Sequence, residues 1–126
     1  MKYIIDSYAW IEYLDGSHKG DKVREVLAKD GEIYIIALTV SEVISRAKRK
    51  SKDTTIAYET IIMNSKIIDI TPEMANDAGL FHAEIRKRIK DFGLVDSLML
   101  IAAHKLGAKI LTGDAHFKGF REAILI

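Results

Sequence analysis

Cysteine is absent from the 126-residue chain. Disulfide bonds, thiolate metal sites and thiol catalysis are therefore excluded. The sequence also lacks an uninterrupted apolar run of about 18 residues, the length that a membrane-spanning helix needs. Its first residues, MKYIID, have neither the apolar stretch nor the small-residue cleavage site of a secretory signal. We therefore expect a cytoplasmic protein with no membrane association.

Neither sign of charge is in excess. The chain has 19 Lys and Arg residues against 18 Asp and Glu residues, which gives a net charge of +1. The total charge therefore carries no information on nucleic-acid binding, and only the distribution of charges matters. Apolar residues make up 48% and charged residues 29% of the chain, a balance typical of a globular protein. The length, without repeats or linkers, predicts a single domain over residues 1–126.

Short isoleucine-rich runs alternate along the chain with longer segments of helical periodicity. The predicted strands are residues 3–6, 33–37, 66–70, 109–112 and 123–126, because β-branched residues favour strands. The predicted helices are residues 21–29, 40–49, 54–65, 73–90 and 94–106, and a further helix opens after Asp6. This alternation predicts a mostly parallel sheet of five strands with helices on both faces.

Local signals predict several helix boundaries. Thr39 and Glu42 have the Thr-x-x-Glu spacing of a capping box at the start of the 40–49 helix. Thr71 and Pro72 suit the N-cap and the first position of the 73–90 helix. Gly107 is expected to end the 94–106 helix in a left-handed conformation.

Four acidic residues follow predicted strands or open predicted helices: Asp6, Glu42, Asp96 and Asp114. In open α/β sheets the ligand site lies outside the carboxyl ends of the strands. Helices that run back along a parallel sheet begin at that same edge. We therefore expect these four side chains to share one edge of the sheet.

Each of these acids, taken singly, also has a purely structural interpretation. Asp6 and Asp114 can cap the following helices, Glu42 can complete its capping box, and Asp96 can interact with a helix dipole. Taken together, however, four carboxylates at one edge repel each other unless a cation lies among them. Carboxylate oxygens are the preferred ligands of a hard divalent ion such as Mg²⁺. The joint pattern therefore favours a divalent-metal site.

The histidines do not form a recognisable metal motif. His18, His82, His104 and His116 are scattered and share no metal-ligand spacing. We expect them at the surface or in helix packing, and only His116 lies in the loop of one of the acids. Zn²⁺ is accordingly a less favoured ion than Mg²⁺.

Two basic runs, RAKRKSK at 46–52 and RKRIK at 86–90, are candidates for binding a polyanion. The candidate residues are Arg46, Lys48, Arg49, Arg86 and Lys87. Arg46 is the best placed, because it follows Glu42 by one helical turn. The alternative is that these cations are solvated and interact only with the dipoles at helix carboxyl ends.

The blocks IIDSYAW, TVSEV and LVDSLMLIAAHKLGAKILTGDAHF together resemble the PIN-domain ribonucleases, most closely their small VapC-type toxins. The resemblance extends over essentially the whole chain. It implies a three-layer α/β/α sandwich and a metal-dependent endoribonuclease that uses one or two Mg²⁺ or Mn²⁺ ions. It also implies an RNA substrate, a cognate antitoxin as partner and a homodimer.

Carried over position by position, the resemblance assigns catalytic and metal-binding roles to Asp6, Glu42, Asp96 and Asp114. Ser7 and Thr112 become supporting hydroxyls. Many members have a second acid or an asparagine near Asp114, where this chain has Gly113 and Ala115. A weaker or water-mediated second metal site is one implication.

Three other functions compete with this interpretation. A haloacid-dehalogenase-like phosphatase needs a second aspartate two residues after the first, and Tyr8 occupies that position. A non-catalytic module of the same fold that binds RNA or protein is harder to exclude, although retention of all four acids speaks against a degenerate site. An RNA-processing PIN nuclease outside toxin-antitoxin systems is the third alternative.

Overall fold

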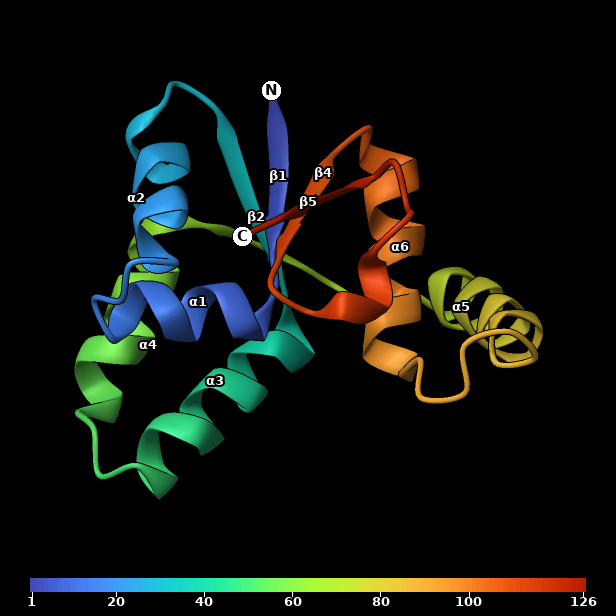
Figure 1. Cartoon of the computed structure of the whole chain (residues 1–126). Coiled ribbons are helices and arrows are strands. Elements are labelled where there is room, and N and C mark those ends of the chain that lie inside the picture. Colours follow the sequence, from blue (N-terminus) through green and yellow to red (C-terminus); the bar gives the residue numbers. More distant parts are fainter.

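The sheet has five strands, all parallel, in the order β3-β2-β1-β4-β5 (Figure 1). The computed structural model describes every residue from 1 to 126. The strands are β1 (Lys2–Ile5), β2 (Glu32–Ile36), β3 (Lys66–Ile68), β4 (Lys109–Thr112) and β5 (Ala123–Leu125). The first strand of the chain is thus the middle strand of the sheet, flanked by β2 and β4.

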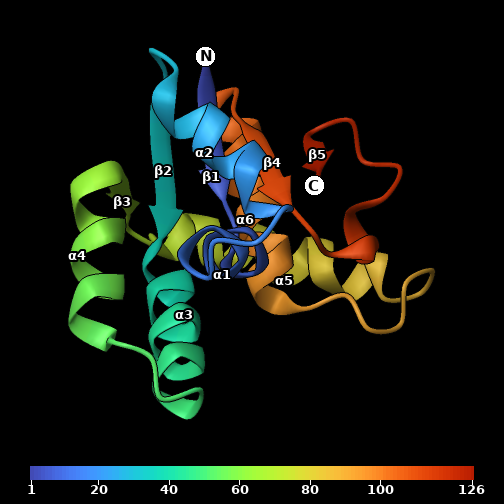
Figure 2. The same cartoon turned by 60° about the vertical axis from the view of Figure 1, so that its left-hand side comes forward.

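Helices cover both faces of the sheet, as the alternating pattern predicts. The helices are α1 (Ser7–Leu14), α2 (Gly20–Ala28), α3 (Ala37–Arg49), α4 (Thr54–Asn64), α5 (Pro72–Ile85) and α6 (Leu94–Leu106), with a short 3₁₀ turn η1 (Ala115–Phe117). Helices α5 and α6 pack together on one side, and α1 to α4 lie on the other (Figure 1). Figure 2 shows α3 and α4 side by side. The predicted three-layer α/β/α sandwich is confirmed. No helix combines the length and the apolar character needed to cross a membrane.

Alternating side chains of the strands divide the core in two. Ile4 of β1 and Ile110 of β4 are buried against α5 and α6. Ile5 and Leu111, the next residues, are buried on the other face with Trp10 of α1. Strand side chains point alternately to opposite faces, and the consecutive residues Tyr3, Ile4 and Ile5 are all buried because helices cover both faces.

Helix α3 begins earlier than its sequence predicts, and the predicted capping box is wrong. The helix starts at Ala37, with Ile36 as an N-cap that offers no side-chain hydrogen bond. Thr39 lies within the helix, is buried, and its hydroxyl has no hydrogen-bond partner. Tertiary packing of the α3 face that carries Thr39 and Val43 overrides the local capping signal. Glu42 is thereby released from a capping role.

Helix α5 ends at Ile85, five residues before the predicted end at Lys90. After Ile85 the backbone tightens into turns, in which Lys87 N donates to Glu84 O and Arg88 N to Ile85 O. Ile85 and Phe92 are both buried in the core below α5 and α6, and the chain must turn between them. The sequence does not predict this earlier end of the helix, because RKRIK contains good helix formers and no glycine or proline.

The other boundaries agree closely with the sequence. Helix α6 and strand β4 have the predicted limits, and Gly107 ends α6 with φ of 66° in the left-handed region. Thr71 caps α5 by accepting a hydrogen bond from Met74 N, with Pro72 at the first helical position. Strand β3 is an edge strand that ends at Ile68, so Asp69 follows the strand and is exposed.

Candidate active site

Asp6 follows β1 directly and is also the N-cap of α1. One carboxylate oxygen accepts a hydrogen bond from Ala9 N at 2.8 Å, which satisfies a free amide at the helix start. The other accepts the hydroxyl proton of Thr112 at the end of β4. Both side chains are buried. The hydrogen bond between Thr112 and Asp6 joins the neighbouring strands β1 and β4 at their carboxyl ends. It explains why a buried carboxylate directly follows β1.

Thr112 connects Asp6 to the loop after β4. Its hydroxyl oxygen accepts a hydrogen bond from Asp114 N at 2.9 Å while its proton goes to Asp6. Asp114 in turn caps the η1 turn, because its Oδ1 accepts from His116 N at 2.8 Å. A single buried hydroxyl thus fixes the positions of both acids.

Asp96 reaches the same edge from α6. It lies in the first turn of that helix, and its Oδ2 accepts a hydrogen bond from Gly93 N at 3.2 Å. Ligand atoms of Asp96, Asp114 and His116 all lie within 4.8 Å of one another. The edge where these residues meet is the lower end of the sheet in Figure 1, where α1 and α3 also begin.

Glu42 stands on the rim of this cluster, on the exposed side of α3. It lines an open hollow of ≈ 470 Å³ together with Ser7, Ile11, Ser41, Ser45, Arg46 and Arg49. Ser7 follows Asp6 in the chain, so the hollow begins where the acidic cluster ends. The guanidinium groups of Arg46 and Arg49 form no salt bridge and no hydrogen bond within the chain, and are free to bind an anion.

Burial and mutual repulsion raise the pKa of three of the acids. The pKa of Asp6 is raised from 3.8 to about 7, chiefly by burial and also by the charges of Asp96 and Asp114, although the hydrogen bonds from Thr112 and Ala9 lower it. Burial followed by the charge of Asp114 raises the pKa of Asp96, although Gly93 and His116 oppose this.

The pKa of Glu42 is also raised. Partial desolvation and then the charge of Asp96 raise its pKa, while the Ser7 hydroxyl acts in the opposite direction. The coupling of Asp6 to Asp96 and Asp114, and of Glu42 to Asp96, places all four predicted acids in one electrostatic unit. A cation placed among them would relieve the repulsion.

The structure separates the predicted basic residues into two groups. Arg46 and Arg49 line the hollow beside Glu42, whereas Lys48 does not. Arg86 and Lys87 lie beyond the end of α5 and have local partners: Arg86 Nε donates to Lys90 O at 2.8 Å, and Lys87 pairs with Glu84 at 3.2 Å.

His116 is the functional candidate that the sequence pattern misses. The expected packing role is seen, because the ring is half-buried and packs against Phe92, but the ring also lies within the acidic cluster. Its Nδ1 is 3.2 Å from Asp114 Oδ1. The only signal in the sequence is its position two residues after Asp114.

Tyr8 and Gly113 form a second contact that the pattern does not predict. The tyrosine ring lies against the backbone of Gly113, so that a Cβ atom there would be 2.2 Å from two ring carbons. Lys19 Nζ donates a hydrogen bond to the Tyr8 hydroxyl at 3.0 Å. Gly113 separates Thr112 from Asp114, so the ring borders the loop that holds both.

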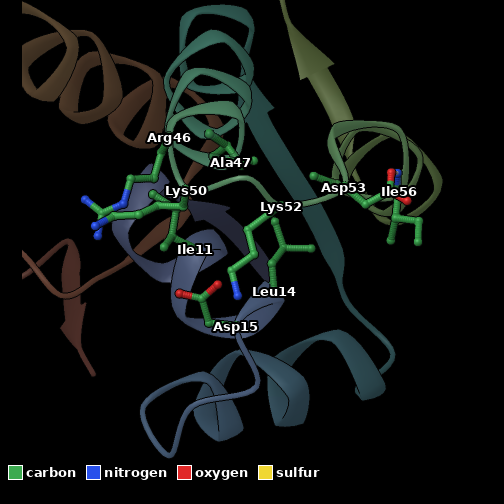
Figure 3. A pocket seen from close by; sticks show the side chains of 11 residues that line it. Ile11, Leu14, Asp15, Arg46, Ala47, Lys50, Lys52, Asp53 and Ile56 are labelled. Carbon is green, nitrogen blue, oxygen red and sulfur yellow. The ribbon is translucent and has the colours of Figure 1, made fainter.

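A second hollow lies on the other side of Arg46, between α1, α3 and α4 (Figure 3). Its volume is ≈ 170 Å³ and most of its floor is apolar, including Ile11, Val43 and Ile56. Lys50 and Lys52 stand at its edge with Arg46 (Figure 3). Asp15 and Asp53 also line it, so the groove combines an apolar base with a border of mixed charge.

A family model described as PIN domain matches residues 3–123. The chain belongs to the PIN domain family. No curated protein sequence matches the chain significantly.

Solved structures that resemble this PIN domain share its fold over nearly their whole length. VapBC2 from Rickettsia felis, bound to a promoter DNA fragment, has 21% identity and a TM-score of 0.74, covering 100% of this chain and 98% of that one. The sarcin-ricin loop cleaving toxin VapC20 from Mycobacterium tuberculosis has 16% identity and a TM-score of 0.74, covering 95% and 97%. A toxin-antitoxin complex from Klebsiella pneumoniae has 19% identity and a TM-score of 0.73, covering 97% and 95%.

Proposed function

We propose that this PIN domain is a divalent-metal-dependent endoribonuclease that hydrolyses phosphodiester bonds in RNA. The observation that carries the proposal is the convergence of Asp6, Asp96 and Asp114, with Glu42 at the rim, in a member of the PIN family. Carboxylates held together at a cost in repulsion, with raised pKa values, are typical of a functional site.

The donor set fits a divalent ion. Asp96 and Asp114 offer carboxylate oxygens within 4.8 Å of each other and of a His116 nitrogen. The charges of both acids act on Asp6, and that of Asp96 acts on Glu42. We assign one or two Mg²⁺ or Mn²⁺ ions to these four acids. When bound, such an ion supplies Lewis acidity that activates water and neutralises the anionic transition state.

Other residues of the site orient the acids, and one of the acids accepts a proton during the reaction. Thr112 holds Asp6 and the backbone of Asp114 in one arrangement, so little reorganisation is needed on substrate binding. We assign to the Glu42 carboxylate, which lies at the rim beside the Ser7 hydroxyl and has a raised pKa, the role of accepting a proton from the attacking water. In-line attack on phosphorus then leaves a 5′-phosphate and a 3′-hydroxyl.

The hollow on α3 suits the RNA backbone. An acidic site repels a polyanion, and Arg46 and Arg49 provide compensating positive charge next to Glu42. Ser41 and Ser45 add hydroxyl donors on the same face. Lys48, Arg86 and Lys87 contribute to RNA binding at longer range by raising the local potential.

We expect Arg46→Gln and Arg49→Gln to weaken RNA binding more than Lys48→Gln, which removes the same charge from the same helix outside the hollow. The measurement is fluorescence anisotropy of a labelled oligouridylate in EDTA, over a range of salt concentrations. Each arginine that contacts one phosphate should reduce the slope of log K against log salt by about 0.7. Equal slopes for all three variants would show that RNA does not bind in the hollow.

We further propose that the protein is the toxin of a toxin-antitoxin pair, acts in the cytoplasm and forms a homodimer. Support for the toxin role comes from the structural neighbours, which are toxins and toxin-antitoxin complexes. The groove of Figure 3, with an apolar base and a border of mixed charge, suits an amphipathic segment of an antitoxin. The protein purified without an antitoxin should therefore be able to cleave RNA.

The test of the nuclease proposal is cleavage of a panel of structured RNAs by the purified protein. We expect cleavage with Mg²⁺ or Mn²⁺, none with chelator, and none by Asp96→Asn under any condition. Cleavage that survives chelator would overturn metal dependence. RNA binding without cleavage in any metal would instead favour a non-catalytic RNA-binding module.

A further inference from the structure

The ring of His116 is held in the acidic cluster by contacts on several sides. Its backbone N–H donates to Asp114 Oδ1 at 2.8 Å, and its Nδ1 lies 3.2 Å from the same oxygen. The ring also packs at a tilt against buried Phe92, with centroids 6.5 Å apart. About a third of the side chain is exposed (35%). The imidazole is therefore fixed beside Asp96 and Asp114.

We propose that His116 is a metal ligand and makes this site prefer transition-metal ions such as Mn²⁺ and Co²⁺ over Mg²⁺. The inference rests on the metal site of the proposed function and changes its donor set from oxygen alone to oxygen and nitrogen. Ligand atoms of Asp96, Asp114 and His116 lie within 4.8 Å of one another, so one ion can draw on all three with small side-chain shifts.

The chemistry of the donors sets the direction of the preference. Imidazole nitrogen binds first-row transition metals well, whereas Mg²⁺ favours oxygen ligands and retains several waters. An added nitrogen donor therefore strengthens binding of Mn²⁺ or Co²⁺ and contributes little to binding of Mg²⁺. Gly113 and Ala115, the neighbours of Asp114 in the chain, provide no ligand atom of a side chain.

The rival role for His116 is that of a counter-ion. A protonated imidazole between Asp96 and Asp114 would neutralise part of their charge and compete with any metal ion. The two roles predict opposite effects of removing the imidazole. A counter-ion's removal tightens metal binding, and a ligand's removal weakens it.

Isothermal titration calorimetry distinguishes the ligand role from the counter-ion role. The full chain is titrated with MnCl₂, CoCl₂ and MgCl₂ in the absence of RNA. His116→Phe removes the nitrogens and keeps an aromatic ring against Phe92. We expect it to lower Mn²⁺ and Co²⁺ affinity by about tenfold or more, and Mg²⁺ affinity by at most about twofold. His104→Phe, an exposed histidine in the last turn of α6, is the matched control and should leave all three affinities unchanged.

A second measurement needs no substitution. Pulsed EPR of the Mn²⁺-loaded natural sequence should show coupling to a histidine nitrogen. Absence of that coupling, or tighter metal binding in His116→Phe, would overturn the proposal. Nitrogen coupling in a protein that cleaves no RNA would leave the inference standing while the nuclease function fails. RNA cleavage at an oxygen-only site would do the reverse.

Discussion

Replacement of Asp6 by asparagine is expected to abolish RNA cleavage and at the same time to stabilise the metal-free protein. Asparagine keeps an oxygen for Ala9 N but removes the charge that the acidic cluster contributes to a divalent ion. The ionised carboxylate is buried beside Asp96 and Asp114, so folding with Asp6 charged is costly. Activity and stability should therefore move in opposite directions.

The pH dependence of stability follows from the raised pKa of Asp6. Its pKa rises from 3.8 to about 7 on folding, so the folded state holds the proton more tightly than the unfolded chain. The associated stability is fully present below the unfolded pKa and is lost as pH rises through the folded pKa. Between these limits the free energy of unfolding should fall with rising pH by about 1.4 kcal/mol per unit.

Chemical unfolding in EDTA at several pH values measures this effect. At about pH 8 we expect Asp6→Asn to be more stable than the natural sequence, and this gain should shrink towards acid pH. The gain should be smaller than the about 4 kcal/mol that the pKa shift alone corresponds to, because the buried Thr112 hydroxyl loses its acceptor. Asp30→Asn is the matched control, since Asp30 is exposed and precedes β2 at the opposite edge of the sheet. Undiminished cleavage by Asp6→Asn would remove Asp6 from the mechanism, and a pH-independent difference would remove the electrostatic explanation.

Gly113→Ala is expected to damage the site through a steric clash with Tyr8. The φ angle of Gly113 is not in the left-handed region, so the constraint is space and not backbone conformation. A Cβ atom 2.2 Å from two ring carbons forces either the ring or the loop to move. Overpacking of this kind costs about 1 to 3 kcal/mol, and a displacement of about 1 Å among catalytic groups lowers the rate up to about a hundredfold.

A double-mutant cycle assigns the damage to this contact. Tyr8→Ala should relieve the clash, so the double variant Tyr8→Ala with Gly113→Ala should recover part of the stability and activity lost in Gly113→Ala. Gly79→Ala is the control, because nothing lies within 4 Å of a Cβ atom there and alanine favours a helix. Additive effects of the two substitutions would show that Tyr8 is not the obstacle.

The convergence of the acids was predictable because it follows from topology. Once strands alternate with helices, the ends of parallel strands and the starts of returning helices meet at one edge. Helix α6 and strand β4 were also predictable in detail, since helical periodicity, Gly107 and an isoleucine-rich run leave little freedom. In that block the local and the tertiary preferences agree.

Other features depend on contacts between distant segments and were not predictable. Burial of Thr39 decides the start of α3, and burial of Phe92 decides where the chain turns after α5. The place of His116 in the cluster requires the position of α6, which brings Asp96 beside the loop after β4. The fit of Tyr8 over Gly113 requires side-chain coordinates, because the two residues are far apart in the sequence.

The hydrogen bond between Thr112 and Asp6 spans 106 positions of the chain. During synthesis, β1 emerges from the ribosome long before β4, and it cannot take its place in the middle of the sheet until β4 arrives beside it. The proposed cleavage centre is therefore completed only when almost the whole polypeptide has been made. Unfinished chains, still attached to the ribosome and surrounded by its RNA, therefore contain only part of the proposed active site.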